Sequence, residues 1–139
     1  MFHNFNHNLL PQFELNRIDS PTGRRYVLPD NTSYESVTTW LSRTSDNTWL
    51  EEWRAREPNA DKIVERASKR GTALHENAES FLMNKEVNVS SLNLIDKSLF
   101  IPLSKVLIDR VDNIRAVEYQ LYSHSLKLAG TVDLVADFD

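Results

Sequence analysis

The sequence predicts an α/β fold, expected in this chain in its α+β form, with helices first and the beginning of a β-sheet after them. Two observations lead to this prediction. Apolar residues recur at helical spacing from Ser36 to about Val111. After Asn113 the pattern changes to two short runs that are rich in β-branched and aromatic residues. Because two strands are marginal by themselves, we expect the sheet to be incomplete.

Two regions are expected along the chain. Residues 1–35 are predicted to form a loosely structured N-terminal arm, punctuated by proline and glycine, in which residues 24–28 have the composition of a short strand. Residues 36–139 are predicted to form a helical region followed by the first β-hairpin of the main domain. The length of 139 residues suits one domain with a modest core.

Helical spacing predicts four helices. They are expected from Ser36, from near Asp46 to Pro58, from Asn59 or Asp61 to about Met83, and from about Ile95 to Val111. Ser36 is a plausible N-cap, and Pro102 lies early enough in the fourth helix to kink it or to mark its true start. The helical spacing of Trp40, Trp49 and Trp53 favours packing of these side chains in the core.

The two runs after Asn113 have the character of strands. Residues 114–122 and 126–138 are joined by the short polar link Ser123-His124-Ser125. An antiparallel hairpin is the simplest way to connect them.

Composition excludes several classes of protein. The absence of cysteine excludes a disulfide framework, a thiolate zinc site and a cysteine nucleophile, and it fits a reducing cytoplasm, the location we expect. The first ten residues lack the apolar core of a signal peptide, and no run approaches the roughly 18 apolar residues of a membrane span. The net charge of −4 argues against a protein that coats nucleic acid by charge alone.

The third predicted helix contains a pair of residues suited to a functional site. His75 and Glu79 are four residues apart, so they share one helical face and can converge on one target. Gly71 precedes His75 by about one turn, where the missing side chain allows another backbone to approach closely. The structural alternative is a histidine on the helix that is simply hydrogen-bonded to Glu79.

Each predicted strand carries one notable carboxylate. Glu118 lies between Val117 and Tyr119, and the alternative for it is the solvent-facing position of an alternating strand. Asp133 lies between Val132 and Leu134, where an unpaired carboxylate is costly to bury and a divalent metal is a natural partner. Asp133 also has the alternative of simply pointing outward.

Together these segments resemble the RecB-like branch of the PD-(D/E)XK nuclease superfamily, in particular mitochondrial genome maintenance exonucleases and their bacteriophage relatives. The resemblance rests on Gly71-Thr72-x-x-His75-x-x-x-Glu79, Val117-Glu118, Gly130-Thr131-Val132-Asp133-Leu134-Val135-Ala136, and the earlier runs at residues 25–29 and 34–41. It covers the chain from about residue 24 to the end. It implies a restriction-endonuclease-like mixed sheet and a metal-dependent DNA exonuclease acting at single-stranded ends in phage or bacterial DNA processing, recombination or repair.

The resemblance also implies a role for each site residue. Asp133 would be the central metal-binding carboxylate, His75 a ligand from the helix, and Glu118 a supporting acid. Glu79 would orient the ring of His75. One or two Mg²⁺ or Mn²⁺ ions would make a water nucleophilic and neutralise charge on the phosphate.

One element of the family pattern has no counterpart in this chain. Family members carry an acid-x-Lys motif on the strand after the central aspartate, whereas here only six residues follow Asp133, and Lys127 precedes it. We expect the isolated chain to have little or no nuclease activity, with the site completed by a further C-terminal segment or a second polypeptide. The alternatives are a non-catalytic DNA-binding or interaction fragment of the same fold, and an unrelated helical module.

Several side chains are candidates for contact with single-stranded DNA. The basic residues on or beside the third helix are Lys62, Arg66, Lys69 and Arg70, although interleaved Asp61 and Glu65 fit an ordinary solvated face equally well. In the arm, Arg24 and Arg25 would add charge and Tyr26 a stacking surface.

Overall fold

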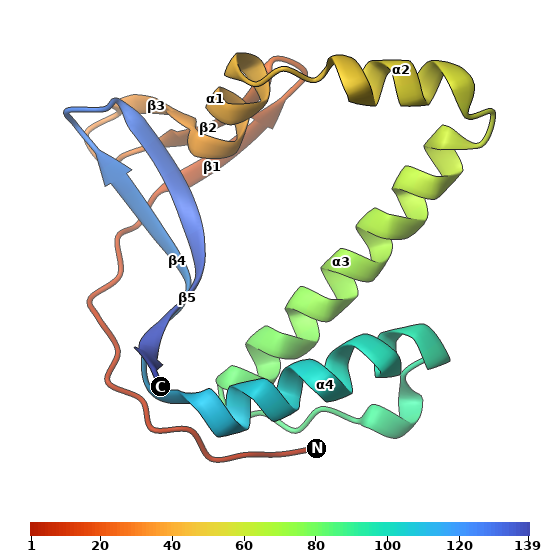
Figure 1. The fold of residues 1–139 in the computed structure, drawn as a ribbon. Helices are drawn as coiled ribbons and strands as arrows, with labels where there is room; N and C mark the ends of the chain where they lie inside the picture. Colours follow the sequence, from red (N-terminus) through yellow and green to blue (C-terminus); the bar gives the residue numbers. More distant parts are fainter.

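The computed structural model describes residues 1–139 as four α-helices and a five-stranded sheet, which confirms the predicted mixture of helices and strands (Figure 1). The strands are β1 (Asn16–Ser20), β2 (Gly23–Val27), β3 (Ser33–Ser36), β4 (Val111–Ser123) and β5 (Leu128–Phe138). The helices are α1 (Val37–Thr44), α2 (Thr48–Arg56), α3 (Ala60–Leu82) and α4 (Leu94–Arg110), with a short 3₁₀ turn at Val89–Ser91. None of the helices combines the length and apolar character needed to cross a membrane.

The sheet is mixed and open, with the strand order β1-β2-β3-β5-β4. β4 and β5 pair antiparallel along their length as the predicted hairpin. β3 pairs parallel to β5, but only through Glu35 opposite Leu128 and Ser36 opposite Ala129. From Gly130 onward, the edge of β5 that faces away from β4 therefore has no partner strand.

The predicted loose arm is wrong for residues 16–35, most of which form the antiparallel strands β1, β2 and β3. Proline and glycine mark tight turns between short strands here, which is how these residues are commonly used. Residues 1–10 also find partners, because Asn8 and Leu10 donate backbone hydrogen bonds of 2.8 Å to the carbonyls of Ile114 and Arg115 on β4. The run at residues 24–28 was expected as a strand, and it forms β2.

The four helices lie close to their predicted positions. Ser36 caps α1, since its hydroxyl accepts a 3.1 Å hydrogen bond from the backbone N–H of Thr39. α2 ends just before Pro58, as expected. Pro102 lies inside α4, which begins at Leu94, so the proline does not mark the start of that helix.

Two separate hydrophobic clusters hold the fold together. The first joins the end of α3, α4, the far end of the β4–β5 hairpin and the N-terminal arm, and its buried members are Phe5, Phe81, Leu82, Val87, Phe100, Leu107, Val111 and Ile114. The second lies under β2 and β3 and the start of β5, and contains Leu15, Tyr26, Leu28, Tyr34 and Ala129.

The tryptophans do not pack in either cluster, so the prediction of core packing is wrong for them. Trp49 is 67% exposed, and α2 has no buried residue. α2 and the first half of α3 extend away from the sheet (Figure 1), and no side chain from Asp61 to Thr72 is buried. An amphipathic helix buries its apolar face only where another element packs against it, and no element of this chain covers these turns.

Candidate metal centre

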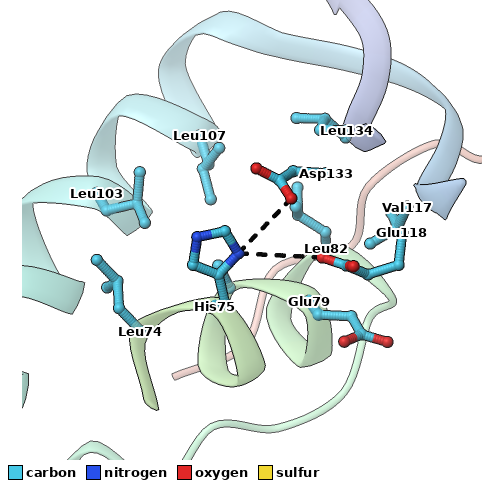
Figure 2. A pocket seen from close by; sticks show the side chains of 11 residues that line it. Leu74, His75, Glu79, Leu82, Leu103, Leu107, Val117, Glu118, Asp133 and Leu134 are labelled. Carbon is cyan, nitrogen blue, oxygen red and sulfur yellow. Dashed lines mark ion pairs between the residues drawn. The ribbon is translucent and has the colours of Figure 1, made fainter. Parts of the chain in front are cut away.

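Three side chains from three different elements converge at one point. His75 comes from α3, Glu118 from β4 and Asp133 from β5 (Figure 2). His75 Nδ1 lies 4.0 Å from Glu118 Oε1 and 3.8 Å from Asp133 Oδ1. One ligand atom from each residue lies within 4.8 Å of the others, and this is the group of acidic and histidine side chains in the structure that could hold a metal ion.

The hairpin register explains how the two carboxylates meet. Val117 pairs with Leu134 and Tyr119 pairs with Val132, so Glu118 and Asp133 lie opposite each other between these pairs. Glu118 has a left-handed backbone with φ of 52°, which is uncommon for a residue other than glycine and is often found at functional sites. This conformation interrupts the strict alternation of the strand, and Val117 and Glu118 both line the cavity described below.

The helix contributes His75 through the packing of its last turns. Leu82 is buried in the first cluster and lies two turns after His75, on the same helical face. Burial of Leu82 against the hairpin therefore turns His75 toward the two carboxylates. The histidine depends on a tertiary contact for its position, and the carboxylates depend on strand pairing.

The three side chains line a cavity of about 180 Å³ that lies between α3, α4 and the hairpin. Its other walls are largely apolar: Leu74, Ala78, Leu82, Leu103, Leu107, Val117 and Leu134, with Glu79 also present. Figure 2 shows leucine side chains above and beside the imidazole ring. Charges interact more strongly beside apolar walls than in open water. No lysine or arginine lines this cavity.

The environment of Glu118 is unfavourable for its own negative charge. Partial burial raises the pKa of the Glu118 carboxyl, and the carboxylates of Asp133 and Glu79 raise this pKa further. The nearby His75 and Arg17 act in the opposite direction and do not cancel the shift. A cation between the carboxylates would relieve this repulsion, so the electrostatics favour a positively charged ligand.

The raised pKa of Glu118 leads to a stability prediction. The ionised Glu118 carboxylate is less favourable in the folded protein than in the unfolded chain. It therefore destabilises the fold at pH values above the raised pKa, and this destabilisation disappears at pH values below the ordinary glutamate pKa of 4.5. We therefore expect Glu118→Gln in EDTA to be more stable than the parent at pH 7, by less than about 1 kcal/mol because solvent screens the site. The gain should vanish near pH 4. Urea unfolding at both pH values measures it.

Glu76→Gln is the matched control, since Glu76 is exposed on α3 and lies outside the cavity. It removes the same charge and should leave stability unchanged within error. An equal gain in both variants, or a loss in Glu118→Gln at pH 7, would contradict the electrostatic account.

Two details of the predicted site are corrected by the structure, and one alternative is decided. Glu79 makes no hydrogen bond with His75, and it acts instead on the charge of Glu118. The side chain of Asp133 is 70% exposed, which is the outward-pointing alternative, and it still lines the cavity. Nothing lies within 4 Å of the position of a Cβ on Gly71, so no backbone approaches there.

The candidate DNA-binding residues lie in two places. Arg66, Lys69 and Arg70 lie on the exposed half of α3 before His75, and Lys69 forms a 2.8 Å ion pair with Glu65, as the solvated-face alternative expects. Tyr26 is buried, and its hydroxyl is 2.8 Å from that of Thr131, so its proposed role as a stacking surface is wrong.

The two arginines of β2 have partners within the fold. Arg24 forms a 2.7 Å ion pair with Asp19, and Arg25 donates a 2.8 Å hydrogen bond to Ser33. Arg17 on β1, which influences the charge of Glu118, was not singled out from the sequence. No local signal marks it, because it lies near Glu118 only where the segment around residues 12–17 passes beside β4 in the folded protein.

The donor set fits a divalent cation. Two carboxylates supply hard oxygen ligands of the kind that Mg²⁺ and Mn²⁺ prefer, while the imidazole nitrogen of His75 suits transition metals. Neither a protein-family model nor a curated protein matches this sequence.

Proposed function

We propose that this protein is a metal-dependent deoxyribonuclease whose ion, Mn²⁺ or Mg²⁺, is held by His75, Glu118 and Asp133. The observation that carries the proposal is the convergence of these three ligand atoms within 4.8 Å from a helix and two strands. The motifs that contain them resemble those of PD-(D/E)XK nucleases, and this resemblance supports DNA, in particular single-stranded ends, as the substrate.

The chemistry of the site is consistent with phosphodiester hydrolysis. A divalent cation at this position supplies a Lewis acid that neutralises phosphate charge and makes a water nucleophilic at neutral pH. The apolar wall formed by Leu103, Leu107 and Leu134 limits the access of bulk water to that side of the site.

A basic residue to position the nucleophile has to come from elsewhere, because none lines the cavity. The edge of β5 beyond Ala129 carries unpaired backbone groups next to Asp133, and such an edge accepts a further strand. We propose that a strand from a further segment or a second polypeptide pairs there and contributes the lysine. The isolated chain should therefore hydrolyse DNA slowly or not at all.

The test separates metal binding from turnover. Mn²⁺ titration followed by electron paramagnetic resonance should show one site in the parent chain, a site lost in His75→Ala and kept in Glu76→Ala. Hydrolysis of fluorescent single-stranded DNA should be at most marginally faster for the parent than for His75→Ala. Unchanged Mn²⁺ affinity in His75→Ala would overturn the proposed metal site, and robust turnover would overturn the need for a further strand.

The absence of a basic residue at the cavity favours a second candidate, a non-catalytic DNA-binding protein of the same fold. That function predicts DNA binding that does not depend on the metal site. If the parent and Asp133→Asn bind single-stranded DNA with the same affinity in EDTA, the result would support a DNA-binding protein over the nuclease.

A further inference from the structure

A second cavity adjoins the metal centre and was not predicted from the sequence. Its volume is about 210 Å³, and its lining residues are Gln12, Phe13, Arg17, Glu118, Gln120 and Thr131. Glu118 also lines the first cavity, so this carboxylate lies between the two. A molecule that binds in the second cavity would therefore lie directly beside an ion held by Glu118.

The second cavity has one aromatic surface. Phe13 is 47% exposed, although its ring is held by Tyr122 at 5.4 Å and Tyr119 at 6.1 Å between ring centroids. A ring that is exposed yet fixed by its neighbours offers a preorganised surface for a flat partner. Nucleic-acid bases stack on such rings, with little dependence on which base is present.

Two amide side chains supply polar contacts at the same place. Gln120 Oε1 accepts a 3.2 Å hydrogen bond from the backbone N–H of Leu15, which leaves its amide N–H groups to donate. Gln12 makes no side-chain hydrogen bond in the structure, so its amide can both donate and accept. Paired donors and acceptors of this kind match the edge of a base.

Arg17 adds the positive charge that is missing from the first cavity. Its guanidinium donates to Asp19 at 3.2 Å, and both side chains are exposed. Exposed ion pairs contribute little to stability, so the guanidinium can exchange its partner at small cost. A phosphate is a suitable replacement because its oxygens accept the paired N–H groups of arginine.

We propose that this cavity binds one nucleotide of a single-stranded DNA, with the base on Phe13, the base edge at Gln12 and Gln120, and a phosphate at Arg17. A ring face, two amides and a guanidinium match the three parts of a nucleotide that proteins recognise. This proposal rests on the proposed function, since it places the nucleotide next to the phosphate that the metal centre would hold.

The test uses the full chain with Mn²⁺ and labelled hexathymidylates in which each position in turn is abasic. Anisotropy should show one position at which the missing base weakens binding by roughly fivefold or more, the range expected for one stacked base. In Phe13→Ala that position should no longer matter, while Mn²⁺ affinity stays unchanged. Phe2→Ala, which removes an exposed phenylalanine from the arm, should retain the parent pattern.

Gln12→Ala serves as a second variant, because its side chain makes no contact on which folding depends. Losing one net hydrogen bond predicts roughly two- to tenfold weaker binding, confined to oligonucleotides that keep the base at the sensitive position. The proposal is overturned if no position is sensitive in the parent, or if Phe13→Ala weakens all oligonucleotides equally. If the parent binds Mn²⁺ and His75→Ala does not, either of these results rejects the nucleotide site and leaves the proposed function standing. If the parent does not bind Mn²⁺, the proposed function itself is rejected.

Discussion

Asp133→Asn is expected to abolish most of the stabilisation of the folded protein by Mn²⁺ that the proposed metal site predicts. Asparagine keeps the size of the side chain but removes the charge that attracts the cation. Altering a residue that merely supports a metal ligand costs 10–100-fold in affinity, so loss of the proposed central ligand should cost at least about 100-fold. The effect is measured as the change in unfolding free energy between EDTA and Mn²⁺.

The size of the difference follows from mass action. At an Mn²⁺ concentration 100 times the parent's Kd, binding stabilises the parent by about 2.7 kcal/mol. A variant that binds 100-fold more weakly gains only about 0.4 kcal/mol at the same concentration. A gap of roughly 2 kcal/mol between the two proteins is well above the error of thermal or urea unfolding.

The sign of the effect should reverse without metal. In EDTA the carboxylate of Asp133 repels Glu118 and contributes to its raised pKa, so Asp133→Asn should be as stable as the parent or slightly more stable. Asp109→Asn, an exposed change on α4 outside the cavity, is the matched control and should respond to Mn²⁺ like the parent. If Asp133→Asn also responds like the parent, Asp133 is only a solvated strand carboxylate.

Local sequence patterns were sufficient to predict the positions of the helices and of the β4–β5 hairpin. The positions of α3 and α4 follow from helical spacing, and that of the hairpin from the polar link at residues 123–125. The convergence of His75, Glu118 and Asp133 was also expected, because the three motifs that contain them together resemble those of PD-(D/E)XK nucleases. None of the three positions would have been informative alone.

Features that depend on distant parts of the chain were not predicted. β1 and β2 acquire a role only when β3 pairs with β5, almost a hundred residues later in the chain. The apolar spacing of α2 predicted burial, but burial also requires a facing surface, and Trp49 has none. Similarly, Arg17 and Phe13 lie beside Glu118 only because residues 11–17 pass next to β4 in the folded protein.

The site and the first hydrophobic cluster form one continuous structure. Leu74, Leu103, Val117 and Leu134 line the cavity and also pack against the buried side chains of that cluster. The position of His75 relative to the two carboxylates therefore depends on how tightly the end of α3 packs against α4 and the hairpin. A defect in this cluster should affect stability first and the geometry of the candidate metal centre as a consequence.

Phe81→Ala is expected to be the most destabilising single change in this region. Phe81 is fully buried and contacts the rings of Phe5 and Phe100 edge-to-face, at 5.4 and 5.7 Å between centroids. Truncating a buried phenylalanine costs roughly 3–5 kcal/mol through lost burial and the cavity left behind. Small domains are stable by about 5–15 kcal/mol in total, so this change should remove a large part of the stability. Urea unfolding in EDTA measures it.

Phe2→Ala is the control for this change, since it deletes the same side chain at an exposed position of the arm and should alter stability by less than about 0.5 kcal/mol. Because Phe81 joins the arm to α3 and α4, its loss should also release the first residues from β4, seen as faster amide exchange at Asn8 and Leu10. A loss of under about 1 kcal/mol, with exchange at these amides unchanged, would mean that the arm and α3 are not held by this cluster. The position of His75 would then have to depend on the hairpin contacts of Leu82 alone.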